Sequence, residues 1–201
     1  MKNYAIDIIV LPPKNIMRRC VKISRKFSHL DRYPFPLNLK DNLPHISLFF
    51  GVVSEKNLLK VAWVVKNIAA EYASLPLKLT RFNSDVMAGE PMHFLDLEIT
   101  KKLRYLQNKI IAAATPLTSR QAEKKMFYIK PGEHFNPITK LWVKKYLKTS
   151  IGKKFSPHIT LRTSKIKTIK LPINFNASAL AIGHFGDKCT VRKILYKAIL
   201  K

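Results

Sequence analysis

One five-residue pattern occurs twice in the sequence and contains the residues best suited to chemistry. Residues 44–48 read PHISL and residues 157–161 read PHITL, so one copy lies in each half of the chain. A second chance match to such a pattern is improbable in a chain of 201 residues. Because side chains alternate between the two faces of a strand, each histidine shares a face with the hydroxyl residue two positions later. The repeat therefore predicts a pseudo-symmetric cleft formed by two similar strands.

The residue types in the two motifs fit acid–base chemistry at phosphorus. Histidine takes up and releases a proton near neutral pH, so His45 and His158 could serve opposite sides of one phosphodiester. The hydroxyls of Ser47 and Thr160 can donate hydrogen bonds to the non-bridging oxygens. Arg162 continues along the face of His158 and can add positive charge. This set needs no metal and no cofactor, and we expect neither.

A structural interpretation of the motifs remains open beside the functional one. A single histidine of this kind is more often a half-buried strand residue, with the nearby hydroxyl satisfying a backbone group. The repetition favours the functional interpretation. Outside the motifs, His134 follows a turn and is expected to be solvated, and both Trp63 and Trp142 fall in helical patterns typical of packing residues.

Aromatic residues flank both motifs. Any of them could stack on a nucleobase, as aromatic side chains do in single-stranded RNA recognition, although core packing is the more common role. On strand alternation alone, Phe49 is expected on the face of His45 and Ser47. The flanking aromatic residues are Tyr33, Phe35, Phe49 and Phe155.

The elements that must position the motifs follow from hydrophobic periodicity and capping residues. Their order indicates an α+β fold with helices outside mainly antiparallel sheets. Strands are predicted at 4–11, 45–53, 77–82, 93–99, 158–162, 180–185 and 191–200, with a further candidate at 126–130. Helices are predicted at 14–28, 55–72, 101–114 and 137–147, with Ser54 and Thr100 as N-caps of the second and third.

Composition points to a phosphate-rich partner. The chain has 37 Lys and Arg against 12 Asp and Glu, a formal charge of +25. Its two cysteines have no CxxC spacing, which excludes a zinc site built on cysteines. Asp7 interrupts the first apolar run, which argues against a signal peptide, and no apolar stretch is long enough to span a membrane. We expect a cytoplasmic protein without a membrane partner.

The paired motifs resemble those of the two-histidine (2H) phosphoesterase superfamily, which includes 2′-5′ RNA ligase proteins and RNA 2′,3′-cyclic phosphodiesterases. The resemblance covers most of the chain and implies one bilobal domain over residues 1–201, with pseudo-two-fold symmetry and antiparallel sheets lining a central cleft. It implies that His45 and His158 are the acid–base pair, with His158 as base and His45 as acid, and that Ser47 and Thr160 hold the phosphate. In the family an arginine often follows the second motif one position later than Arg162 does here.

The resemblance also implies a reaction class. We expect a metal-independent RNA phosphodiesterase that hydrolyses 2′,3′-cyclic phosphate ends, acts on RNA or an oligonucleotide carrying such an end, and is a monomer. Ligation or cleavage of a 2′-5′ linkage would use the same residues. A non-catalytic RNA-binding module of the same fold, or a small cyclic or ADP-ribose-derived phosphate as substrate, are further alternatives.

Overall fold

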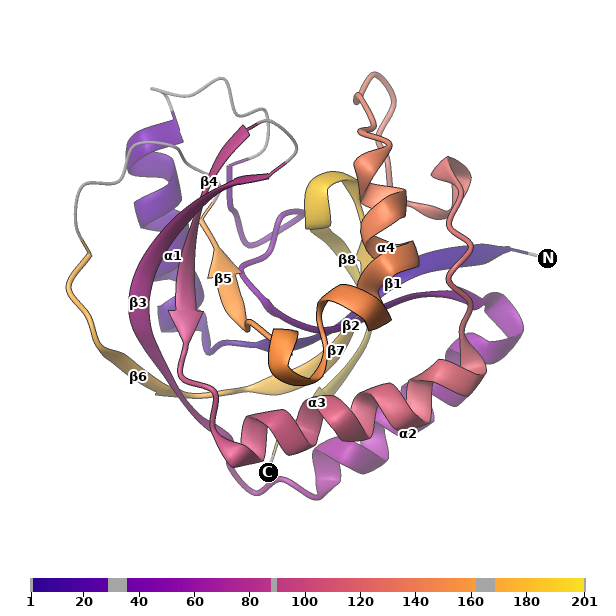
Figure 1. Cartoon of the computed structure of the whole chain (residues 1–201), viewed down its shortest axis with the longest axis horizontal. Helices are drawn as coiled ribbons and strands as arrows, with labels where there is room; N and C mark the ends of the chain where they lie inside the picture. The colour runs from indigo at the N-terminus through magenta and orange to yellow at the C-terminus, as the bar shows by residue number, and fades with distance from the viewer. Residues whose placement is uncertain (1, 29–35, 88–89, 162–168, 201) are drawn as a thin grey trace.

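The computed structural model describes residues 2–28, 36–87, 90–161 and 169–200. Within these residues the chain forms two four-stranded antiparallel sheets with helices around them, as the sequence predicts (Figure 1). The predictions for Arg162, Tyr33 and Phe35 concern positions outside the described residues.

Each sheet combines strands from distant parts of the chain. The first has the order β2-β1-β7-β8, with β1 (Asn3–Leu11), β2 (Ile46–Ser54), β7 (Ala179–Phe185) and β8 (Val191–Ile199). The second has the order β5-β4-β3-β6, with β3 (Pro76–Met87), β4 (Glu90–Leu97), β5 (His158–Thr160) and β6 (Ile173–Asn176). The first motif therefore belongs to one sheet and the second motif to the other.

Four α-helices are present in the described residues: α1 (Lys14–Ser28), α2 (Glu55–Ala70), α3 (Lys101–Ala114) and α4 (Ile138–Thr149). Ser54 and Thr100 cap α2 and α3 as predicted, because each hydroxyl oxygen accepts a hydrogen bond from the backbone three residues later. Short 3-10 turns follow as η1 (Thr115–Leu117), η2 (Lys124–Met126), η3 (Gly152–Lys154) and η4 (Asp187–Cys189). No helix in the described residues is both long and apolar enough to cross a membrane.

The helices α2 and α3 lie together along one side of the molecule (Figure 1). The helix α2 contacts β7 and β8, and α3 contacts β2, so both helices cover the first sheet. Their buried residues recur at helical spacing, as the sequence pattern indicates: Val61, Val65 and Ile68 in α2, and Leu103, Leu106 and Ile110 in α3. The core that they cover supports the strand that carries the first motif.

The structure corrects several boundaries. Residues 126–130 do not form a strand. Met126 ends the turn η2, and the amide of Tyr128 donates to the carbonyl of Phe185. The strand β6 is absent from the prediction, because a run of four residues is too short to give a clear pattern even though its apolar and polar residues alternate. The strands β3 and β4 extend further toward their shared turn than predicted, whereas β5 ends at Thr160.

A bulge changes which side chains of β2 face the site. Ile8 of β1 pairs with Phe49, but Ile9 pairs with Ser47, so Leu48 is an extra residue in β2. The alternation therefore shifts by one position beyond Leu48. The prediction that Phe49 shares the face of His45 and Ser47 is wrong: Phe49 is fully buried, and Phe50 faces the cavity instead.

Candidate active site

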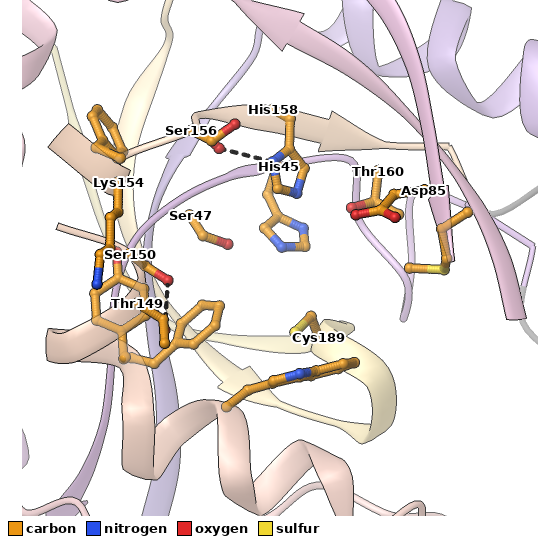
Figure 2. A pocket seen from close by; sticks show the side chains of 15 residues that line it. His45, Ser47, Asp85, Thr149, Ser150, Lys154, Ser156, His158, Thr160 and Cys189 are labelled. Atoms are coloured by element: carbon orange, nitrogen blue, oxygen red, sulfur yellow. Dashed lines mark hydrogen bonds between the residues drawn. The ribbon is translucent and has the colours of Figure 1, made fainter. Parts of the chain in front are cut away.

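The two motifs meet at one cavity of about 400 Å³ between the sheets. His45 stands directly before β2 and Ser47 lies within it, whereas His158 and Thr160 are the first and last residues of β5. All four line the cavity, and Figure 2 shows both imidazoles pointing into it, with Ser47 on one side and Thr160 on the other. The structure thus brings together the four described residues that the motifs single out.

Both imidazoles are held in the same way. The Nδ1 atom of His45 is 2.6 Å from the carbonyl oxygen of Leu43, and that of His158 is 2.8 Å from the carbonyl oxygen of Ser156. A carbonyl oxygen can only accept, so Nδ1 carries the hydrogen in each ring. In the neutral form each Nε2 then has a lone pair, which is what a general base needs.

Neighbouring strands fix the position of His158. The strand β5 pairs with β4 so that Asp96 is opposite His158 and Phe94 is opposite Thr160. The Phe94 ring packs edge-on against the imidazole, with centroids 4.6 Å apart. These contacts hold the second motif at the edge of its sheet.

A polar residue of the neighbouring strand β1 contacts the first motif and was not among the predicted site residues. Asp7 of β1 is fully buried, and its Oδ2 lies within hydrogen-bonding distance of Ser47 Oγ, at 2.7 Å, and 3.5 Å from Nε2 of His45. Burial raises the pKa of this carboxyl well above its ordinary value, although the hydrogen bond from Ser47 opposes the shift. The signal in the sequence was a lone acidic residue inside an apolar strand, a position that is seldom charged without a reason.

Aromatic side chains form much of the remaining wall: Phe50, Trp142, Tyr146 and Phe155. The prediction that Trp142 is only a packing residue is corrected, since its half-buried ring faces the cavity from α4. Tyr146, one helical turn further along, donates from its hydroxyl to the carbonyl of Leu48 at 2.7 Å. Burial raises the pKa of Tyr146 well above its ordinary range, so the phenol stays protonated and continues to donate.

The hydroxyl residues Thr149, Ser150 and Ser156 also line the cavity, and two charged residues and a cysteine reach it from separate elements. Lys154 comes from η3, Asp85 from β3 and Cys189 from η4 (Figure 2). His134 is exposed and is not among the lining residues, in agreement with its expected solvation. The described lining thus combines one cation, one carboxylate and a thiol with the two motifs.

Two antiparallel sheets each bring a histidine and a hydroxyl to one cleft, and this architecture is similar to that of E. coli LigT. Among solved structures, TT0787 of Thermus thermophilus is 19% identical, with a TM-score of 0.61 over 98% of this chain and 97% of that one. E. coli LigT complexed with NADP+ is 15% identical, with a TM-score of 0.55 over 100% and 99% of the two chains. Identities this low establish the fold alone.

Searches by sequence add no further relative. No protein-family model matches the chain, and no curated protein matches it. Because one fold can host many functions, the function depends on the residues of the site.

Proposed function

We propose that this protein is a metal-independent 2H-type phosphoesterase that opens 2′,3′-cyclic phosphate ends of RNA. The observation that carries the proposal is the matched pair of imidazoles, each with its Nδ1 hydrogen on a carbonyl and both lining one cavity. Two such groups can perform both proton transfers that hydrolysis of a phosphodiester requires.

The proposed reaction assigns one proton transfer to each histidine. His158 takes a proton from water, and the oxygen of that water attacks phosphorus; the bond from phosphorus to one ribose oxygen then breaks, and His45 protonates that oxygen. The hydrogen bond between His158 and Ser156 is exposed, whereas that between His45 and Leu43 is partly buried, which favours His158 as the group that meets water. Hydroxyls of Ser47 and Thr160 donate to the non-bridging oxygens and stabilise the charge that develops on them.

The cavity also suits a nucleoside. Its volume of about 400 Å³ and its aromatic wall are typical of small-ligand sites that bury a ring system. Structures of E. coli LigT have been solved with phosphate and with ATP, at TM-scores of 0.52 for each. These complexes support a nucleotide as the ligand class for the present cavity.

The decisive experiment is a ring-opening assay in EDTA with a short RNA that ends in a 2′,3′-cyclic phosphate. Wild type should open the ring, whereas His45→Ala and His158→Ala should each lose about a hundredfold or more of the rate, the typical contribution of a general acid or base. His134→Ala is the matched control, because this exposed histidine does not line the cavity. Its rate should equal that of wild type.

The products and the failures of this assay separate the alternatives. Chromatography against 2′- and 3′-phosphate standards identifies the ester bond that breaks. If wild type binds the RNA but leaves the ring intact, the next substrates are 2′-5′ linked oligonucleotides, in both cleavage and ligation. Binding without turnover of either would indicate a non-catalytic RNA-binding module.

A further inference from the structure

A carboxyl group is buried behind the first motif, and the reaction proposed above makes no use of it. Asp7 lies in β1, an interior strand of its sheet, and has no exposed surface. Its Oδ2 is 2.7 Å from Ser47 Oγ and 3.5 Å from His45 Nε2, whereas its Oδ1 is buried without a hydrogen-bond partner among the described residues. The group therefore contacts both functional residues of this motif without lining the cavity itself.

The surroundings of Asp7 favour its neutral form. A buried carboxylate that receives one hydrogen bond is poorly compensated for the loss of water. Two titratable groups lie near Asp7: His45, directly before β2, and Tyr146 of α4, whose pKa is raised in part by the negative charge that an ionised Asp7 would carry. On the β7 side, the residue opposite Asp7 is Gly183, which has no titratable group. In the described part of the chain no lysine or arginine forms an ion pair with Asp7, and the 3.5 Å separation from His45 is long for a charge-assisted hydrogen bond.

Protonation of Asp7 decides the direction of its hydrogen bond with Ser47. An ionised carboxylate can only accept, so the Ser47 hydrogen must point toward Asp7. A neutral carboxyl can donate from Oδ2 to Ser47 Oγ, which allows the serine hydrogen to point into the cavity. The 2.7 Å separation fits either direction. Only the second lets Ser47 donate to a phosphate oxygen.

We propose that Asp7 is a positioning residue whose neutral carboxyl donates to Ser47 and directs the serine hydroxyl toward a non-bridging oxygen of the substrate. The assignment rests on the proposed function and adds to it a residue of β1. The negative charge of a bound phosphodiester further disfavours ionisation of Asp7, so substrate reinforces the arrangement that binds it.

The assignment predicts a specific pH dependence. Asp7 is neutral below its raised pKa, so the Ser47 contact is present there and is lost as pH rises through that pKa. The value of kcat/KM should then fall by at least about tenfold, because one hydrogen-bond donor to the charged phosphate oxygens is lost. In Asp7→Asn the amide can donate to Ser47 at every pH, so activity at low pH should stay within about threefold of wild type and this decline should disappear.

The experiment compares wild type with Asp7→Asn, Asp7→Ala and Ser47→Ala in pH profiles of kcat/KM on the cyclic-phosphate RNA. Asp7→Ala and Ser47→Ala should both be about tenfold or more below wild type at low pH, because neither directs a serine hydroxyl. In parallel, the Asp7 carboxyl carbon of wild type is titrated by 13C NMR and assigned by its absence in Asp7→Asn. It should titrate well above the ordinary pKa of about 3.9.

Two results would overturn the assignment. One is an Asp7→Asn protein that is folded by circular dichroism yet as impaired as Asp7→Ala, since the site would then need the ionised form. The other is titration of the Asp7 carboxyl near its ordinary pKa, which is measured on wild type and does not depend on any variant folding.

Failure of the proposed function is distinguishable from failure of the Asp7 assignment. If wild type opens no ring, the affinity for inorganic phosphate replaces turnover as the readout. The ratio of the affinities of wild type and Asp7→Asn should then fall as pH rises through the Asp7 pKa. A constant ratio over that range contradicts the assignment.

Discussion

The orientation of each motif imidazole is encoded within three consecutive residues. In both motifs a proline separates the histidine from the residue whose carbonyl accepts its Nδ1 hydrogen. The proline ring restricts its own φ angle, which limits the positions that the preceding carbonyl can take. The short motif can therefore determine the orientation of its imidazole ring in either sheet.

Trp142 provides a test of nucleobase recognition. Its ring faces the cavity from α4, and stacking of a base on an aromatic ring contributes about 1–3 kcal/mol. Trp142→Ala should therefore raise KM for the cyclic-phosphate RNA by about tenfold, while kcat changes little because the motifs are untouched. Steady-state kinetics on a dinucleotide substrate measures both values.

Trp63 offers the matched control for that substitution. Contrary to the prediction that it is a packing residue, it lies on α2 with 66% of its surface exposed, and it does not line the cavity. Trp63→Ala should leave KM unchanged. Equal KM values for wild type and Trp142→Ala would place the base elsewhere in the cavity.

At the residue level, the sequence predicted the site residues that belong to the repeated motif, but it did not predict the residue whose role depends on its burial. The repeated pattern identified His45, Ser47, His158 and Thr160, all of which reach the cavity. Asp7 was visible as an acidic residue in an apolar strand, but its contact with Ser47 depends on the pairing of two strands that are far apart in sequence. No local pattern reports such a pairing.

Among the elements, the helix α4 carries part of the aromatic wall and is held in place by hydrogen bonds to η4, which is distant in sequence. Asp187, in η4, accepts hydrogen bonds from the backbone of Asn136 at 3.0 Å and from the Thr139 hydroxyl at 2.7 Å, both through Oδ1. These bonds anchor the start of the helix that carries Trp142 and Tyr146. Asp187 is itself buried, so loss of its carboxylate also leaves buried donors unsatisfied.

We therefore expect Asp187→Ala to destabilise the protein by about 3 kcal/mol, the scale of hydrogen bonds to a charged group. Urea unfolding measures this change. Glu98→Ala is the control, because its ion pair with Lys78 is largely exposed and such pairs contribute at most about 1 kcal/mol. Equal unfolding midpoints for the two variants would show that Asp187 does not anchor α4.

Elements with a long periodic pattern were predictable, and those that depend on their neighbours were not. The helices α2 and α3 were recognised from their caps and buried stripes. The strand β6 is only four residues long and exists through its pairing with β3. The bulge at Leu48 likewise arises from the pairing of β1 with β2, which is why alternation alone placed Phe49 wrongly.

At the level of the whole molecule, the charge of +25 should control substrate length preference. Lys154 already lines the cavity, and exposed lysines continue along α4: Lys144, Lys145 and Lys148. A strand of RNA that leaves the cavity along this side would meet several cations. A dinucleotide would meet few of them.

The affinity of a ten-nucleotide RNA should therefore depend on salt more steeply than that of a dinucleotide with the same cyclic end. Four contacts with phosphates correspond to a slope of about −3 in a plot of log K against log salt concentration for a single strand. Fluorescence anisotropy over a series of salt concentrations measures both slopes. Equally shallow slopes would favour a small-molecule substrate.

The interleaving of the strands has a consequence for how the molecule is made. The strand β1 pairs with β7, so Ile6 near the start of the chain cannot find its partner until His184, near the end, has been synthesised. Such non-local pairings fold slowly, because loop-closure entropy must be overcome before the contacts form. The first motif belongs to this sheet, so the sheet cannot form around the motif until β7 (Ala179–Phe185) has left the ribosome. Until then the edge of β1 that pairs with β7 is open to other chains, so the protein is most vulnerable to aggregation during synthesis.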